Sequence, residues 1–97
     1  MAEEKQFENK VKRWLKSKNI YHFKYFGNAF STAGVPDLCL CVNGKFVAVE
    51  LKAEKGKTSP LQDAHIEAIH NSGGIAIVLR PSGFDNFKKI IEVMLND

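Results

Sequence analysis

The sequence predicts a single α/β domain in which helices pack on one mixed β-sheet. A β-hairpin signal lies in the middle of the chain, and a strand, a helix and a further strand follow it. A hairpin pairs its strands antiparallel, whereas a strand–helix–strand crossover adds a parallel strand, so a mixed sheet is expected. The 97 residues suffice for one hydrophobic core but not for two, so residues 1–97 are predicted to form one domain.

The N-terminal part of the chain changes from a helical pattern to a strand pattern. Apolar residues recur at helical spacing over residues 3–17, which predicts an amphipathic helix with a Lys- and Glu-rich outer face. Residues 20–26 are rich in aromatic and β-branched side chains, which is typical of a strand. A polar, glycine-containing connection over residues 28–35 then leads to the hairpin.

The hairpin is predicted from two apolar runs, residues 38–42 and 46–52, that flank Asn43 and Gly44. Both central residues of a type I′ turn need positive φ, which Asn and Gly tolerate best. With these two residues as the loop, successive side chains of each strand point to opposite faces of the hairpin. One face is then wholly apolar and is predicted to join the core; it consists of Leu38, Leu40, Val42, Val47, Val49 and Leu51.

The C-terminal part adds a helix, a strand and a last helix. Ser59 and Gln62 have the spacing of a capping box, so a helix is predicted to begin directly after Ser59 and to end before Gly73. The continuous apolar run at residues 75–79 predicts a buried strand. A helical pattern then continues from Phe84 to the C-terminus, which completes the order α-β-β-β-α-β-α.

The second face of the hairpin carries charged side chains. In the same register, Asp37 faces Glu50 across the two strands, and Lys52 lies on the face of Glu50. Two opposed carboxylates repel each other unless a proton, a cation or open water separates them. Their hard oxygen ligands suit Mg²⁺ or Mn²⁺, which would polarise a phosphodiester while the Lys52 ammonium orients water or neutralises charge. The alternative is a solvent-facing acid pair with Lys52 as its salt-bridge partner.

These residues resemble a known nuclease motif. Gly34-Val35-Pro36-Asp37, followed by twelve residues and then Glu50-Leu51-Lys52, resembles the PD-(D/E)XK motif. The further Ser59-x-x-Gln62 and the hydrophobic strand that ends in Arg80 are similar to the VRR-NUC branch, known from bacteriophage, bacterial and eukaryotic repair nucleases. The resemblance spans about residues 34–80 and is carried by the combination of these features.

The resemblance implies a fold, an activity and a set of site residues. The fold would be a restriction-endonuclease-like α-β-β-β-α-β core, here with an extra C-terminal helix. The activity would be Mg²⁺- or Mn²⁺-dependent hydrolysis of DNA phosphodiesters, as in an endodeoxyribonuclease. Asp37 and Glu50 would hold the metal together with the backbone carbonyl of Leu51, and Lys52 would be the catalytic lysine.

Two further residues have competing interpretations. Family members often add a metal-binding carboxylate from the first helix in a Phe-Glu setting, which Glu8 matches, with Glu4 one turn earlier as the alternative. Gln62 is either a catalytic-site residue that contacts substrate or a metal-bound water, or the partner of Ser59 in the capping box.

The basic residues lie in two segments. Residues 1–24 carry seven Lys and Arg against three Glu, and residues 45–57 carry four Lys against two Glu. Together they could form a phosphate-binding face, although each is individually typical of a solvated surface charge, and Arg80 could instead pair with an acid. The candidate DNA contacts are Lys12, Arg13, Lys55, Lys57, Ser59 and Arg80.

Composition narrows the cellular setting. No apolar run is long enough to span a bilayer, and the N-terminus lacks the apolar segment of a signal peptide. Cys39 and Cys41 are too close in sequence to form a disulfide that stabilises the fold, and they are interpreted as small buried residues. We therefore expect the protein to lie in the cytoplasm of a bacterial or phage-infected cell. Trp14, Phe23, Phe84 and Phe87 are predicted to lie in the core, whereas Tyr21, Tyr25 and Phe30 are candidates for base stacking or dimer contacts.

The small size of the chain bears on the substrate. A lone domain without a DNA-reading motif has little surface for base readout, so recognition of DNA structure rather than sequence is expected. Stand-alone VRR-NUC domains of phage and bacterial type resemble symmetric dimers that process branched DNA such as four-way (Holliday) junctions. The prediction is therefore a homodimeric junction endonuclease that needs neither a membrane nor a small-molecule cofactor; the alternative is a non-catalytic nucleic-acid-binding module of the same fold.

Overall fold

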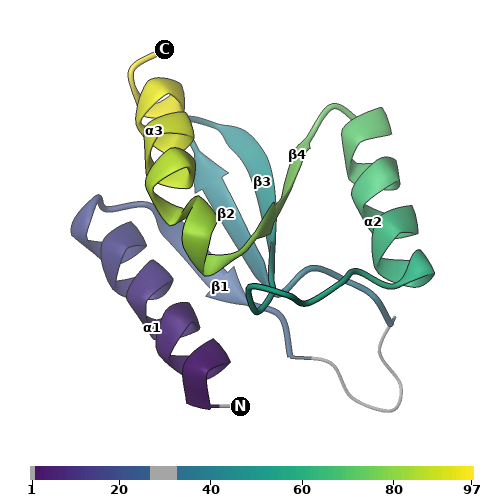
Figure 1. Ribbon diagram of the computed structural model, residues 1–97. Helices are drawn as coiled ribbons and strands as arrows, with labels where there is room; N and C mark the ends of the chain where they lie inside the picture. Colours follow the sequence, from purple (N-terminus) through teal and green to yellow (C-terminus); the bar gives the residue numbers. More distant parts are fainter. Residues whose placement is uncertain (1, 27–32) are drawn as a thin grey trace.

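The computed structural model describes residues 2–26 and 33–97 and shows a helix-flanked sheet (Figure 1). Its order confirms the predicted α/β fold with an extra C-terminal helix, and adds a short 3-10 helix that the sequence pattern did not predict. The elements are α1 (Ala2–Ser17), β1 (Tyr21–Lys24), β2 (Leu38–Val42), β3 (Lys45–Leu51), α2 (Pro60–Asn71), β4 (Ile75–Leu79), η1 (Pro81–Gly83) and α3 (Phe84–Leu95).

The four strands form one mixed sheet in the order β1-β2-β3-β4. The first two pairings are antiparallel and the third, between β3 and β4, is parallel, as the hairpin and the crossover predict. Val42 pairs with Lys45, and Asn43 and Gly44 have φ values of 51° and 80°, which confirms the two-residue turn. β3 begins at Lys45 and ends at Leu51, one residue earlier at each end than predicted.

The core lies between the sheet and the two terminal helices. Helices α1 and α3 cover one face, whereas α2 lies beside β4 and contains no buried residue (Figure 1). The apolar face of the hairpin contributes all six predicted side chains to this core. The other core residues are Phe7, Val11 and Leu15 of α1, Ile20, Leu79 of β4, and Phe84, Phe87, Ile91 and Met94 of α3, with Trp14 packed against them.

The opposite face of the sheet is open near β1 and β2, and this corrects two expectations. Phe23 is 50% exposed rather than buried, because it shares this face with Tyr21 and α2 packs beside β4 at the far side of the sheet. Cys41 is exposed and Cys39 half-buried for the same reason, so neither is a core residue. Phe30 lies outside the described residues. Among the described helices, none is long and apolar enough to cross a membrane.

Candidate active site

The hairpin register brings the predicted acid pair and lysine together at one end of the sheet. Asp37 precedes β2 directly and lies beside Glu50, near the end of β3. The backbone N–H of Leu51 donates a 2.8 Å hydrogen bond to Oδ2 of Asp37, which fixes that carboxylate against the strand. The Nζ atom of Lys52 lies 3.8 Å from Oε2 of Glu50. The end of the hairpin therefore holds two carboxylates and one ammonium side by side.

Glu50 is a carboxyl group in an unfavourable place for a negative charge. It is 5% exposed, and burial together with repulsion from Asp37 raises its pKa to about 7, although Lys52 acts in the opposite direction. A divalent cation between the two carboxylates would remove this penalty. The donor set therefore fits Mg²⁺ or Mn²⁺, which commonly use one or two protein carboxylates and retain several waters.

Gln62 has the capping role and also contacts Glu50 of the acid pair. Its Oε1 accepts from the Ser59 backbone N–H at 2.9 Å, and its own backbone N–H donates to Ser59 Oγ at 3.2 Å, so the capping box is complete. The remaining amide nitrogen, Nε2, donates to Oε2 of Glu50 at 3.1 Å. The start of α2 thus orients a carboxylate of the site, in the way that outer hydrogen bonds orient metal ligands.

Gly34, three residues before Asp37, packs closely against the first turn of α2. Its φ of 81° is a conformation that L side chains rarely adopt, and a Cβ there would lie 2.9 Å from the backbone carbonyl carbon of Leu61. Only glycine permits this close approach. The sequence motif includes Gly34, but its packing against α2 could not be read from the motif.

Glu8 is buried beside the site within a cluster of lysines. Lys24 donates to Oε1 at 2.7 Å, and Lys12 and Lys5 donate to Oε2 at 3.2 and 3.3 Å. Burial alone would raise the pKa of Glu8, but the three ammonium groups outweigh it and lower the pKa to about 2. No motif in the sequence singles out Lys24, although its alternation with Tyr21 and Phe23 along β1 places it on the side of α1.

A cavity of about 270 Å³ lies between α1 and the strand ends that carry Asp37 and Leu51, and it is called the carboxylate cavity here. It is lined by Asp37 and Leu51 on one side and by Glu4, Lys5 and Glu8 of α1 on the other. Both first-helix candidates therefore face it. Within residues 2–26 and 33–97, no three His, Cys, Asp or Glu side chains are placed so that they could hold a metal ion together. The candidate metal set is thus the Asp37–Glu50 pair, with Leu51 and Glu8 nearby.

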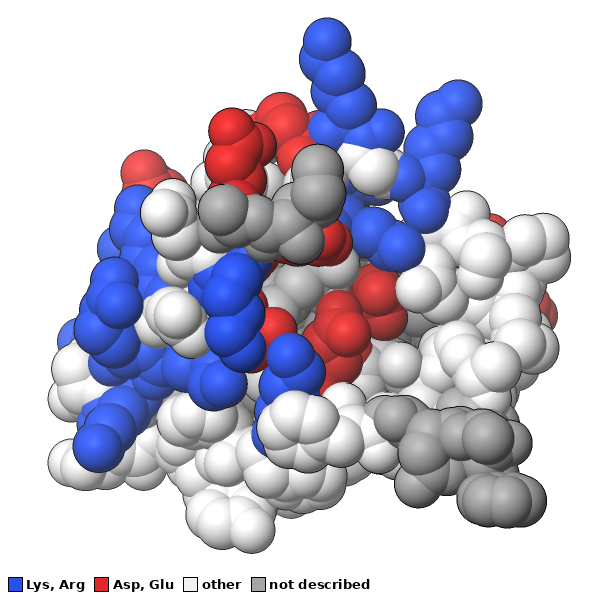
Figure 2. All heavy atoms as spheres, turned by 90° about the horizontal axis from the view of Figure 1, so that it is seen from below, with Lys and Arg blue, Asp and Glu red and all other residues white. Residues whose placement is uncertain are grey.

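Basic side chains flank the acidic groups. Figure 2 shows carboxylates gathered in a hollow with Lys and Arg side chains on either side of it. Lys55 and Lys57 are exposed on the loop after β3, and Arg13 is exposed on α1. This arrangement suits a ligand that carries negative charge along its length but needs a cation at one point.

Arg80 and Ser59 are candidate DNA contacts, and in the structure both make hydrogen bonds within the protein. The Arg80 guanidinium donates to the Gly56 carbonyl from Nε at 3.3 Å and from Nη2 at 2.7 Å. In the same loop, Glu54 accepts from the backbone N–H of Ser82 at 2.9 Å. These contacts fasten the loop that follows Lys52 to the end of β4, while the Ser59 hydroxyl caps α2.

The comparisons with known proteins agree with this geometry. The family model described as the VRR-NUC domain matches residues 2–83. A solved structure titled "VRR_NUC domain protein" superposes with a TM-score of 0.77 at 22% sequence identity, over 96% of this chain and 88% of the other, which shows a shared fold. No curated protein matches the chain in sequence. From the extent of the family match, the chain belongs to the VRR-NUC family of nuclease domains.

Proposed function

We propose that the protein is a Mg²⁺- or Mn²⁺-dependent DNA endonuclease, formed as one domain over residues 1–97. The observation that carries this proposal is the buried Glu50 beside Asp37, with Lys52 in ionic contact. A structural salt bridge between Glu50 and Lys52 would not explain why Asp37 lies next to the buried Glu50, since two neighbouring carboxylates destabilise the folded chain.

The residues have distinct roles in this reaction. Asp37, Glu50 and the Leu51 carbonyl would hold the metal, and Glu8 would be the additional carboxylate of the cavity. When bound, the metal polarises the scissile phosphodiester and lowers the pKa of a water molecule. Gln62 keeps Glu50 oriented through its Nε2 atom. Lys52 stabilises negative charge on the phosphate as the oxygen of water bonds to phosphorus and the bond to the leaving sugar oxygen breaks. The water loses one proton and the leaving oxygen gains one, so the step consumes one water molecule.

DNA lies along the basic groups that flank the carboxylate cavity. Lys55 and Lys57 contact phosphates from the loop after β3, beside the hydroxyl of Ser59, and Lys12 and Arg13 extend the track along α1. Arg80 supports this loop through Gly56 and contacts DNA through the N–H groups that do not bond to Gly56.

The proposed substrate is branched DNA such as a four-way junction, and the proposed active form is a homodimer in the cytoplasm of a bacterial or phage-infected cell. Exposed aromatic side chains on the open sheet face support the dimer, since Tyr21 is 71% exposed and Phe46 49% exposed in the same cross-strand row. Two such sites would act on two strands of one junction. Light scattering at working concentration should therefore give twice the chain mass, and a monomer would contradict this part of the proposal.

The test is cleavage of labelled four-way junction, flap, duplex and single-stranded DNA with Mg²⁺, Mn²⁺ or chelator. We expect cleavage only with metal, fastest on the junction, and none by Asp37→Ala or Glu50→Ala. Cleavage in chelator, or unchanged cleavage by both variants, would contradict the mechanism. Metal-independent DNA binding without cleavage of any substrate would favour the non-catalytic module instead.

A further inference from the structure

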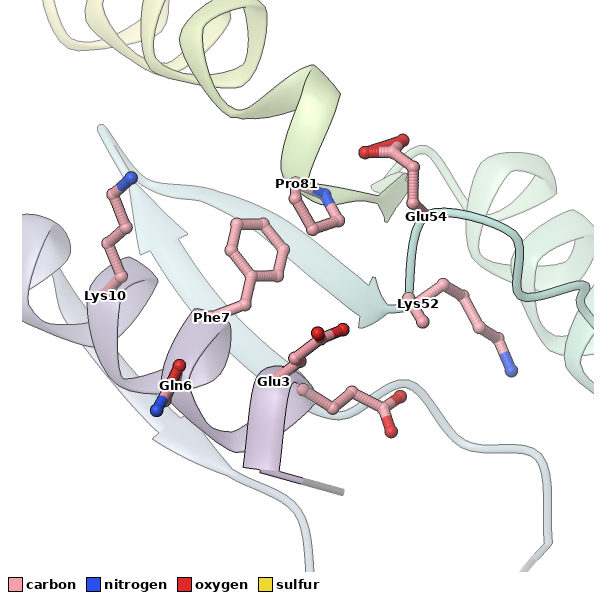
Figure 3. A pocket seen from close by; sticks show the side chains of 9 residues that line it. Glu3, Gln6, Phe7, Lys10, Lys52, Glu54 and Pro81 are labelled. Atoms are coloured by element: carbon pink, nitrogen blue, oxygen red, sulfur yellow. The ribbon is translucent and has the colours of Figure 1, made fainter.

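A second cavity, of about 420 Å³, lies next to the carboxylate cavity. It is formed by the first turns of α1, by residues 52–54 that follow β3, and by Pro81. Figure 3 shows the Phe7 ring directed from α1 towards Pro81, and the Glu3 carboxylate pointing from α1 towards the Lys52 segment. None of the predicted roles uses this space, apart from that of Lys52 and that of Glu4, the alternative to Glu8, at its edge.

The two cavities adjoin each other. Glu4 lines both of them, and the consecutive residues Leu51 and Lys52 line one each. A nucleotide whose phosphate lies against Asp37 and Glu50 therefore has the second cavity within reach of its neighbouring nucleoside.

The lining favours a flat, mostly apolar group with hydrogen-bond donors over a phosphate, because acidic side chains outnumber the two lysines. Phe7, Pro81 and Ala53 provide apolar surface, and Glu3 and Glu4 place acceptors at the rim. The Lys10 ammonium lies 5.5 Å from the centroid of the Phe84 ring, outside the cavity, so Lys10 offers only its aliphatic stem. Within the described residues, the acids do not converge in any group of three that could hold a metal ion.

We propose that this cavity receives an unpaired nucleobase from the nucleotide next to the scissile phosphate, an inference that rests on the proposed nuclease function. The faces of a base match the apolar walls, and the exocyclic amino group of cytosine, adenine or guanine matches the carboxylate rim. Thymine lacks that amino group and binds less well. Branch points offer bases at a low cost of unpairing, so the cavity gives a physical reason for selecting branched DNA without reading an extended sequence.

The test compares junctions that differ at one nucleotide, after the cut position has been mapped. Cytosine, thymine or an abasic residue is placed on each side of the cut, and the Kd is measured in chelator by fluorescence anisotropy, with cleavage rates measured in Mg²⁺. Ala53→Phe fills the cavity from an exposed position, and Val93→Phe, at an exposed position of α3, is the matched control. Glu3→Gln keeps the cavity volume and removes one rim charge.

We expect the wild-type chain to bind the abasic junction about tenfold more weakly than the cytosine junction. This difference should vanish in Ala53→Phe and persist in Val93→Phe, and Glu3→Gln should reduce the preference for cytosine over thymine. Equal Kd values for the cytosine and abasic junctions in the wild-type chain would overturn the base-binding proposal. If metal-dependent cleavage remained in that case, the nuclease assignment would stand alone. Base-dependent binding together with cleavage that continued in chelator would support the cavity and contradict the metal-dependent nuclease.

Discussion

Replacing Glu50 by Gln should stabilise the metal-free protein at neutral and alkaline pH while removing its response to metal. Burial and the neighbouring Asp37 raise the pKa of Glu50 from 4.5 to about 7 in the folded chain. Between these two values the folded state binds more protons than the unfolded state, so the free energy of unfolding falls as pH rises from 4.5 to 7. Gln keeps the shape of the side chain, accepts the Gln62 hydrogen bond and has no charge to bury.

The size of the effect follows from the shift in pKa. A shift of one pKa unit corresponds to 1.36 kcal/mol. The raised pKa of Glu50 therefore lowers the free energy of unfolding of the metal-free protein by about 3 kcal/mol at pH 8. For a domain of this size, the melting temperature of Glu50→Gln should then exceed that of the wild type by roughly 15 °C at pH 8. At pH 4.5 most of this difference should disappear, because Glu50 is then protonated in the folded wild type.

Thermal unfolding followed by circular dichroism, from pH 4.5 to 8 in chelator and again with Mg²⁺, measures both effects. Glu67→Gln removes one negative charge from an exposed position of α2 and is the matched control, which should leave the pH profile unchanged. Mg²⁺ should raise the melting temperature of the wild type and of Glu67→Gln but not that of Glu50→Gln. A Glu50→Gln variant that is less stable than the wild type at pH 8 in chelator would refute the reasoning.

Three further predictions test how the site is built. Gln62→Ala should weaken Mg²⁺ binding about tenfold in titration calorimetry, because Glu50 loses its orienting hydrogen bond; unchanged affinity would contradict that role. Gly34→Ala should lower the free energy of unfolding by roughly 1–3 kcal/mol in urea denaturation, because of its positive φ and the contact with α2, and an equally stable variant would show that this approach is not required. Lys57→Ala should reduce the salt dependence of DNA binding by about one phosphate contact without changing the cleavage rate at saturation, whereas Lys89→Ala on α3 should change neither; equal effects of the two would argue against a DNA contact at Lys57.

The hairpin could be predicted closely because its information is local. Asn43 and Gly44 specify the turn, and the two-residue period then determines which side chains meet, including Asp37 with Glu50. The predicted strand over residues 20–26 is shorter in the structure, Tyr21–Lys24, because its length depends on pairing with β2 rather than on its own composition.

The surroundings of the site could not be predicted to the same degree, because they depend on contacts between distant segments. Lys24 reaches Glu8 across 16 residues of sequence, and Arg80 reaches Gly56 across 24. Each contact forms only when a helix or loop packs on the sheet, and the spacing of residues in the sequence does not predict that packing. The same limit applies to Phe23, because the pattern of its strand is consistent with either a buried or an exposed face of the sheet.

The central claim is that Asp37 and Glu50 hold a divalent ion that is needed to hydrolyse DNA. Its most direct test is the rate of four-way junction cleavage as a function of Mg²⁺ concentration, for the wild-type chain and for Asp37→Asn. The wild-type rate should rise to saturation with Mg²⁺ and fall to background in chelator, and Asp37→Asn should remain at background where the wild type is saturated. Cleavage by Asp37→Asn at the wild-type rate, or wild-type cleavage in chelator, would contradict the claim.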